Sequence, residues 1–257
     1  MPPLKLIFVH TPKSGGTSMR GAVTEFFSPD LVLADDGDRP NDPISPMNID
    51  PYGVLDRWRQ QNAVTLANKA AVIGHFWIAK YEGVGADVRA TILRDPITRA
   101  ISRFFSLPAQ NANNSLHQYV TSNRLTFIEF ARIPRINSFY TSVYFRDVDM
   151  AQFDFIGSYE RLSQDWTATL ARIGIAPALP CGELDRTADL VTEYDARRSE
   201  IPDDHRMMAQ SRDLFADDLR FYERYMSRSL VQSDACFVRH PARREGVRLA
   251  ISIGKHK

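Results

Sequence analysis

A short apolar stretch that runs straight into a loop with two glycines constrains this chain most. Residues 4–9 read Leu-Lys-Leu-Ile-Phe-Val, and residues 10–18 read His-Thr-Pro-Lys-Ser-Gly-Gly-Thr-Ser. Beyond the loop, apolar side chains recur at helical spacing, at Met19, Val23, Phe26 and Phe27. Thr17 or Ser18 can cap the start of this helix. The pattern predicts a buried strand, a tight loop and a helix.

Such a loop is suited to binding an anion. A strand that turns through glycines into a helix start directs several backbone N–H groups and the positive end of the helix dipole to one place. Gly15 and Gly16 let the backbone approach a ligand closely, and Lys13 adds a full positive charge. Thr17 and Ser18 add hydroxyl donors. We therefore expect a site for phosphate or a similar anion; the structural alternative is a lysine-glycine turn with no ligand.

The loop differs from that of the nucleoside triphosphatases. Their pattern, Gly-x-x-x-x-Gly-Lys-Ser/Thr, has the lysine after the last glycine and a hydroxyl that holds magnesium. Here Lys13 precedes both glycines. No strand ends in an aspartate suited to a metal, since Asp154 falls inside a predicted strand and Asp95 is better placed as a helix cap. The pattern favours an anion site that works without a metal ion.

Further short apolar segments alternate with helical patterns along the chain. Strands are predicted at 70–74, 88–93 and 153–157, and helices at 96–105, 160–173 and 202–226. Residues 28–62 show little periodicity, so we expect a long surface excursion with one short helix near 55–60. The alternation predicts one α/β domain over residues 1–257, with a mainly parallel central sheet flanked by helices.

Composition and charge exclude several classes of protein. The formal net charge of +1 does not give the uniformly basic surface of a non-specific nucleic-acid binder. Two cysteines, Cys181 and Cys236, cannot form a disulfide framework or a four-cysteine metal site, although a single bridge stays open. No signal peptide or membrane-spanning segment is evident, so we expect a cytoplasmic protein with no membrane insertion and no nucleic-acid partner.

The C-terminal segment, residues 237–257, carries six basic residues against one acidic residue. Such a tail is either a solvated basic extension or a contact for an anionic ligand or partner.

Two motifs together resemble a known family. Residues 12–18, which contain Lys13 and Ser14, resemble the 5′-phosphosulfate loop of the sulfotransferases that use 3′-phosphoadenosine 5′-phosphosulfate (PAPS). Residues 92–105 resemble the family's 3′-phosphate segment, in which an arginine before Asp-Pro and a serine eight positions later bind that phosphate. Arg94 and Ser102 occupy these positions. Independently of the family, an arginine at a strand exit offers a fork of donors to a phosphate. The alternative is that Arg94 pairs with a carboxylate and Ser102 has no ligand.

Two weaker likenesses extend the resemblance. Residues 156–162 are similar to a family strand that ends in Tyr-Glu, which makes Tyr159 the candidate for adenosine contact; the alternative is a core tyrosine. His75 follows Gly74 where carbohydrate sulfotransferases of the heparan type carry a catalytic histidine. An imidazole can accept a proton near neutral pH, although a histidine that caps a strand end is the alternative. Residues 211–225 also resemble a late helix of the carbohydrate enzymes.

The resemblance is closer to the membrane-bound carbohydrate sulfotransferases than to the cytosolic phenol and steroid enzymes, because of the initial His10 and the double glycine. It departs from the cytosolic family's Arg-Lys-Gly motif, because residues 244–246 read Arg-Glu-Gly and match that motif only in part.

The resemblance implies a P-loop-like three-layer fold and transfer of a sulfuryl group from PAPS to the hydroxyl of a small-molecule or saccharide acceptor, with a sugar favoured over a phenol or a steroid. The nucleotide product is 3′-phosphoadenosine 5′-phosphate (PAP), and the reaction needs no metal. Lys13 would stabilise the leaving oxygen, Ser18 and the loop amides would bind the 5′-phosphate, and His75 would take the acceptor proton. The acceptor side would include 28–69 and 106–150, whose aromatics Trp58, Phe139, Tyr140 and Tyr144 could stack on sugars or simply pack. A nucleotide kinase or triphosphatase and a non-catalytic PAP(S)-binding module are the alternatives.

Overall fold

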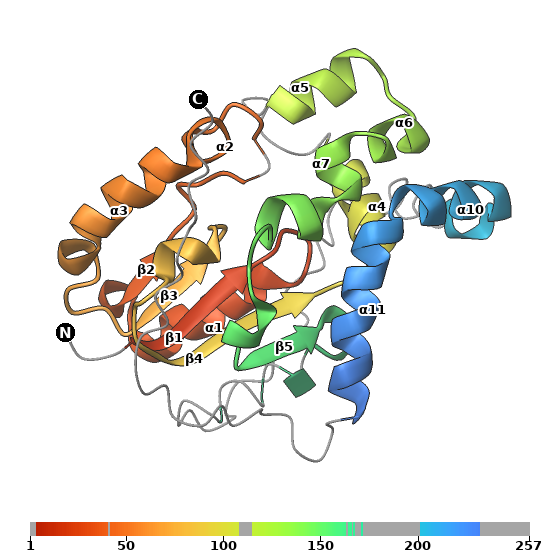
Figure 1. The fold of residues 1–257 in the computed structure, drawn as a ribbon. Coiled ribbons are helices and arrows are strands. Elements are labelled where there is room, and N and C mark those ends of the chain that lie inside the picture. The colour runs from red at the N-terminus through yellow and green to blue at the C-terminus, as the bar shows by residue number, and fades with distance from the viewer. Residues whose placement is uncertain are drawn as a thin grey trace, which may run out of the picture.

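The computed structural model describes residues 4–40, 42–107, 115–162, 164, 165, 167, 171 and 201–231. Its centre is a sheet of parallel strands in the order β2-β3-β1-β4-β5 (Figure 1). The strands are β1 (Leu4–His10), β2 (Val32–Ala34), β3 (Ala71–Gly74), β4 (Ala86–Leu93) and β5 (Phe155–Ser158). The predicted α/β class with a parallel sheet is confirmed.

Helices lie between and after the strands along the chain. They are α1 (Gly16–Phe27), α2 (Pro46–Ile49), α3 (Pro51–Thr65), α4 (Pro96–Ser106), α5 (Ser115–Ser122), α6 (Phe127–Ala131), α7 (Pro134–Asn137), α10 (His205–Leu214) and α11 (Ala216–Val231). The short 3-10 turns are η1 (Pro29–Leu31), η2 (Ile78–Tyr81), η4 (Met150–Gln152) and η5 (Tyr159–Arg161). A π-helical turn, η3 (Phe139–Tyr144), lies between α7 and η4.

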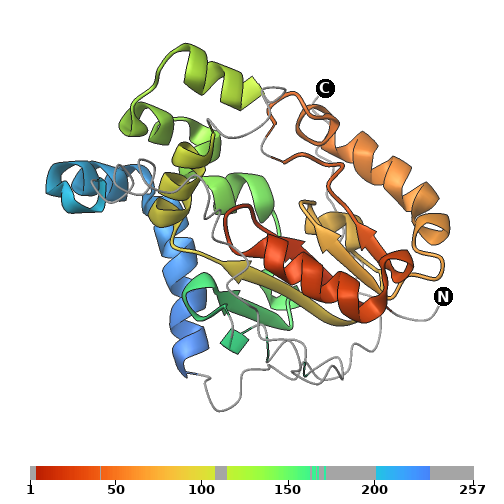
Figure 2. The same ribbon diagram turned by 180° about the vertical axis from the view of Figure 1, so that it is seen from behind.

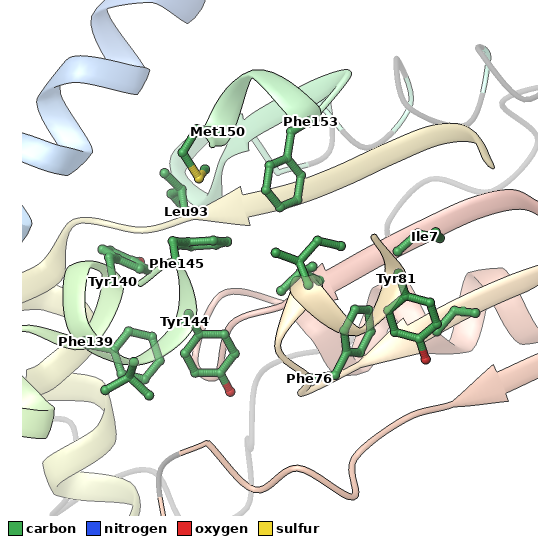
Figure 3. Close-up of a cluster of buried hydrophobic side chains, with 14 of the residues drawn as sticks. Ile7, Phe76, Tyr81, Leu93, Phe139, Tyr140, Tyr144, Phe145, Met150 and Phe153 are labelled. Atoms are coloured by element: carbon green, nitrogen blue, oxygen red, sulfur yellow. The ribbon is translucent and has the colours of Figure 1, made fainter. Parts of the chain in front are cut away.

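The sheet is covered on both faces. Leu6 and Phe8 of β1 pack with Met19 and Val23 of α1, which crosses the sheet in the view of Figure 2. The neighbouring side chains of β1, such as Ile7, point the other way and join a second cluster on the opposite face of the sheet. That cluster includes Phe76, Tyr81, Phe139, Tyr140, Tyr144 and Phe145 (Figure 3). Because successive strand residues point to opposite faces, a buried strand such as β1 is apolar almost throughout.

A third cluster lies beyond the arrowhead end of the sheet, where α4, α5, α6, α7 and α10 pack together (Figure 1). Helix α4 begins as predicted, because the Asp95 carboxylate accepts a hydrogen bond from Thr98 N at 2.8 Å and Pro96 occupies its first turn. Its Ile97, Ala100 and Ile101 are buried.

The interval 28–62 is more ordered than predicted. Residues 32–34 form the edge strand β2, which pairs with β3 from Val32↔Ala71 to Ala34↔Ile73. Helix α3 has 15 residues where a short helix near 55–60 was expected, and it begins where Asp50 accepts a hydrogen bond from Gly53 N. Leu55 is its one fully buried side chain. Such an exposed helix shows no apolar stripe, and for that reason its length was underestimated.

Three smaller predictions are wrong. Gly15, in a left-handed conformation, caps α1 in place of a hydroxyl side chain. The predicted helix 202–226 is broken at the fully buried Phe215, and Asp204 caps α10 by accepting from Met207 N at 2.9 Å. Asp154 precedes β5 instead of lying inside it. The described residues of the predicted helix 160–173 from Leu162 onward are helical. The basic segment 237–257 and both cysteines lie outside the described residues.

Within the described ranges, no helix combines the length and the apolar character that crossing a lipid bilayer requires.

Candidate active site

Three strand exits meet at the middle of the sheet. β1 lies between β3 and β4, and the three strands are parallel, so their carboxyl ends reach the same edge. The loop with Lys13 follows β1, His75 follows β3, and Arg94 follows β4. β3 lies on one side of β1 and β4 on the other, so the strand order changes direction at β1. Ligands of open α/β sheets bind at the carboxyl ends of the strands where the order changes in this way.

The loop between β1 and α1 has the backbone shape of an anion cradle. Lys13 and Gly15 both have positive φ, at 70° and 78°. A Cβ at Gly15 would lie 2.4 Å from Leu162 Cδ2, and one at Gly16 would lie 1.7 Å from His10 Nε2. Larger residues therefore do not fit, and α1, a helix of 12 residues, starts directly from this turn. Thr17 and Ser18 lie in the first turn of α1.

The loop is fastened to β4 by buried hydroxyls. Thr11 Oγ1 lies 3.0 Å from Ser14 Oγ and 3.0 Å from the Ile92 carbonyl oxygen, within hydrogen-bonding distance of both. Thr11 and Ser14 are fully buried. The Ser14 hydroxyl therefore has a partner inside the protein, and this fixes the loop against the neighbouring strand.

Arg94 joins the loop to a third part of the chain. Its Nη1 donates to the Lys13 carbonyl at 3.0 Å, its Nε donates to Thr98 Oγ1 at 3.3 Å, and its guanidinium lies 4.1 Å from the centroid of the Tyr159 ring. Tyr159 is half-buried. Ser102 is buried on α4, the helix that follows Arg94. The predicted loop, arginine and tyrosine thus lie together in the structure.

Tyr140 holds the Arg94 main chain in place, and Asp218 in turn holds Tyr140; the sequence motifs give neither residue this role. Tyr140 Oη donates to the Arg94 carbonyl at 2.8 Å and accepts from Arg94 N at 3.0 Å. Burial, which outweighs the nearby Arg99, raises the pKa of Tyr140 to about 12, so the hydroxyl keeps its proton. Asp218 on α11 accepts from Tyr140 N at 2.8 Å and from Thr141 N at 3.0 Å. Asp218 lies in the predicted helix 202–226, but nothing in its spacing shows that it faces Tyr140.

His75 is held in one tautomer. Its Nδ1 lies 2.7 Å from the His10 carbonyl oxygen, which can only accept, so Nδ1 carries the proton and Nε2 carries the lone pair. Its main-chain N–H donates to Asp36 Oδ1 at 3.0 Å. Burial lowers the pKa of His75, and the His10 carbonyl and Asp36 offset part of that effect. A neutral imidazole whose Nε2 carries the lone pair has the form that a general base needs.

The His10 side chain was singled out by its position before the loop but not as a site residue. Its ring lies 4.3 Å from the His75 ring, centroid to centroid, and packs on Gly16. Burial, and then His75 and Arg20, lower the pKa of His10 well below its ordinary value. Both ring nitrogens are buried and, among the described residues, neither has a hydrogen-bond partner. A buried polar group without a partner is costly, and this one lies against the glycine loop.

Carboxylates from residues 35–38 hold the segment that carries His75. Asp35 and Asp38 both accept from Lys80 Nζ, at 2.7 and 2.8 Å. Asp38 also accepts from Trp77 N at 2.9 Å, and Asp35 from Tyr81 Oη at 2.7 Å. The sequence pattern placed 35–38 in a surface excursion, so this arrangement was missed.

The aromatic residues expected near an acceptor fall into two groups that differ in burial. Phe139, Tyr140 and Tyr144 are fully buried in the sheet-facing cluster of Figure 3, so they pack and do not present a surface to a sugar. Trp58 is partly buried against the same cluster, and Lys80 Nζ lies 4.6 Å from the centroid of its ring. In the described part of the chain, no three or more His, Cys, Asp or Glu side chains are grouped so that they could hold a metal ion.

Neither the family models nor the curated proteins compared with this chain match it. Among solved structures, the chain is similar to a sulfotransferase from Alicyclobacillus acidocaldarius, with a TM-score of 0.36 and 14% sequence identity. The comparison covers 84% of this chain and 97% of that one.

Proposed function

We propose that this chain is a PAPS-dependent sulfotransferase that acts on an acceptor hydroxyl, and that the acceptor is a carbohydrate. One observation carries the proposal. Arg94 contacts the Lys13 carbonyl on one side and the Tyr159 ring on the other. The candidates for the 5′-phosphosulfate, the 3′-phosphate and the adenosine come from separate stretches of sequence, and they converge at the carboxyl edge of the sheet.

The residues present suit such a nucleotide. The loop before α1 offers backbone N–H groups and a helix N-terminus to the 5′-phosphosulfate. Arg94 and Ser102 would bind the 3′-phosphate, and Tyr159 would contact the adenine. Lys13 would lie at the oxygen on which charge develops.

The reaction is an in-line displacement at sulfur. The acceptor oxygen forms a bond to sulfur while the bond between sulfur and the bridging oxygen of the 5′-phosphate breaks, and PAP leaves with that electron pair. The acceptor proton passes to Nε2 of His75, since Nδ1 is already protonated. The chain's contribution is to position the reactants and to stabilise charge, as in phosphoryl transfer.

A carbohydrate acceptor is favoured by the form of His75. Sugar hydroxyls ionise far less readily than phenols, so their sulfation depends more on a base. A histidine that burial keeps neutral, and whose tautomer leaves Nε2 as the acceptor, supplies one.

Calorimetry with PAP, AMP and ATP-magnesium, followed by a sulfate-transfer assay on saccharides and phenols, tests the proposal. We expect tighter binding of PAP than of AMP, and transfer from PAPS to a saccharide without added metal. Binding that favours ATP-magnesium would support a kinase or triphosphatase instead. PAP binding without transfer to any acceptor would leave a non-catalytic nucleotide-binding module.

A further inference from the structure

Asp36 connects His75, the candidate general base, to helix α1. Its Oδ1 accepts from His75 N at 3.0 Å. The same carboxylate binds Arg20 of α1 through a fork, with Nη2 at 2.8 Å from Oδ1 and Nη1 at 2.8 Å from Oδ2. A bidentate pair fixes both the position and the plane of a carboxylate. Asp36 therefore stands between a helix that starts at the anion loop and the residue that follows β3.

We propose that Asp36 is a positioning residue for His75 in the transfer reaction, and that it acts through the His75 main-chain N–H and its own negative charge. The inference rests on the proposed function, in which His75 takes the acceptor proton. It adds a residue from the interval after β2, for which the sequence motifs assign no role.

The backbone around Asp36 leaves little freedom. Asp35 N donates to the Ile73 carbonyl at 3.0 Å, which extends the pairing of β2 with β3. A Cβ at Gly74 would lie 2.0 Å from the Asp35 carbonyl oxygen, so the backbone segments around Asp35 and Gly74 approach closely at this point. This close approach brings the Asp36 side chain to His75, the residue that follows β3.

The neighbouring contacts separate the role of Asp36 from the support of the fold. Asp35 and Asp38 hold Lys80, Tyr81 and Trp77 through buried hydrogen bonds. These bonds attach the segment 75–81 whether or not Asp36 is charged. Asp36 is only half-buried. Removing its charge is therefore expected to change His75 more than it changes folding.

His75 is then fixed at two points. Asp36 holds its main chain, and the His10 carbonyl holds its Nδ1. With both fixed and the His10 ring 4.3 Å from its own, the imidazole has one orientation for Nε2. Small displacements of a catalytic group lower the rate steeply, so the second attachment has a kinetic value.

The charged and titratable groups that face His75 come from four elements. They are His10 of β1, Asp36 after β2, Arg20 of α1 and Arg103 of α4. Burial has the largest effect on the pKa of His75 and lowers it; Asp36 raises it, while Arg20 and Arg103 lower it. Although burial opposes it, the hydrogen bond from Arg20, followed by that from His75 N, lowers the pKa of Asp36, so Asp36 is ionised at neutral pH.

Two substitutions in this arrangement should shift the pKa of His75 in opposite directions. Asp36→Asn keeps an oxygen that can accept from His75 N but removes the charge that stabilises the imidazolium, so the pKa of His75 falls. Arg20→Gln removes a charge that destabilises the imidazolium, so the pKa of His75 rises. We expect only modest shifts of the His75 pKa, in opposite directions, because both side chains are partly exposed. Asp56→Asn on α3 removes an equal charge from an exposed pair with Arg59 and serves as the control.

The experiment measures the acidic limb of kcat/KM against pH for the full chain and these three variants. NMR titration of the His75 imidazole, assigned with His75→Gln, gives the same pKa without substrate. We expect the limb and the NMR pKa to move down in Asp36→Asn, up in Arg20→Gln, and to stay in Asp56→Asn. Asp36→Ala, which also removes the acceptor, should lower kcat roughly 10- to 100-fold with little change in the KM for PAPS.

An active enzyme whose limb and NMR pKa stay unchanged in both variants overturns the role of Asp36 and leaves the proposed function standing. Shifts of the same sign in Asp36→Asn and Arg20→Gln, accompanied by lower stability, would show a structural role only and would also overturn the inference. A wild-type protein that binds no PAP and transfers no sulfate overturns the proposed function, whatever the NMR titration shows.

Discussion

Lys13 occupies a backbone conformation that is unfavourable for a side chain of its kind. Its φ of 70° lies in the left-handed region, which costs an L-residue about 1 to 2 kcal/mol relative to a right-handed conformation. The hydrogen bond from Arg94 to its carbonyl helps to hold it there. A lysine kept in a strained position next to a glycine cradle is consistent with a role for its charge.

Lys13→Ala tests that charge, because alanine bears a comparable backbone penalty. We expect turnover to fall about 100-fold or more, since the charge is needed where negative charge develops in the transition state. PAP affinity, measured by calorimetry, should fall much less. Lys5→Ala, which removes an exposed pair with Asp87, is the control and should leave both values near wild type. Near-wild-type turnover in Lys13→Ala would contradict the assignment.

Arg94→Ala tests the 3′-phosphate. The 3′-phosphate carries about −1.5 to −2 charges and is absent from AMP. We expect the wild-type preference for PAP over AMP to shrink roughly 10- to 100-fold, the value of a hydrogen bond to a charged group. Arg94→Lys keeps the charge without the fork and should recover only part of the preference. Equal affinity of the wild type for PAP and AMP, measured by calorimetry, would refute the site.

At the scale of elements, the π-helical turn η3 links α11 to the site. Two N–H groups near its start, those of Tyr140 and Thr141, donate to Asp218, and its Tyr140 hydroxyl binds both main-chain polar groups of Arg94. Isolated π-helical turns often occur at functional sites. Here the turn transmits the position of α11 to the exit of β4.

Asp218→Ala should therefore destabilise the fold. The substitution leaves two N–H groups in a buried region without their acceptor, and we expect a loss of about 3 kcal/mol in the free energy of unfolding. The neighbouring Asp217, exposed and paired with Arg220, gives the matched control. Its alanine variant should change stability by less than about 0.5 kcal/mol. Urea denaturation measures both, and equal midpoints for the two variants would rule out the proposed capping role.

At the scale of the whole molecule, the proposed nucleotide would lie across the centre of the sheet. The loop after β1 and Arg94 after β4 are on adjacent strands, and Tyr159 follows β5. A ligand that contacts all three binds only the folded chain. PAP at about 100 times its Kd should then add about 2.7 kcal/mol to the free energy of unfolding.

Thermal unfolding at fixed protein concentration measures this effect. The unfolding temperature should rise with PAP and stay unchanged with ATP-magnesium at the same concentration. It should rise less with PAP in Arg94→Ala than in the wild type. A rise with AMP as large as that with PAP would show that the 3′-phosphate is not bound.

The sequence by itself determined the alternation of strands and helices and the glycine loop between β1 and α1, because these depend on local patterns: apolar runs, glycines at a turn, and a cap such as Asp95. Only the tertiary structure decided which polar residues support that loop. Asp36 reaches His75 across 39 residues of sequence, and Asp218 reaches Tyr140 across 78. The edge strand β2 depends in the same way on its pairing with β3. A hydrogen bond between distant residues leaves no periodic trace in either segment, so the supports of the site became visible only once the sheet order placed their partners side by side.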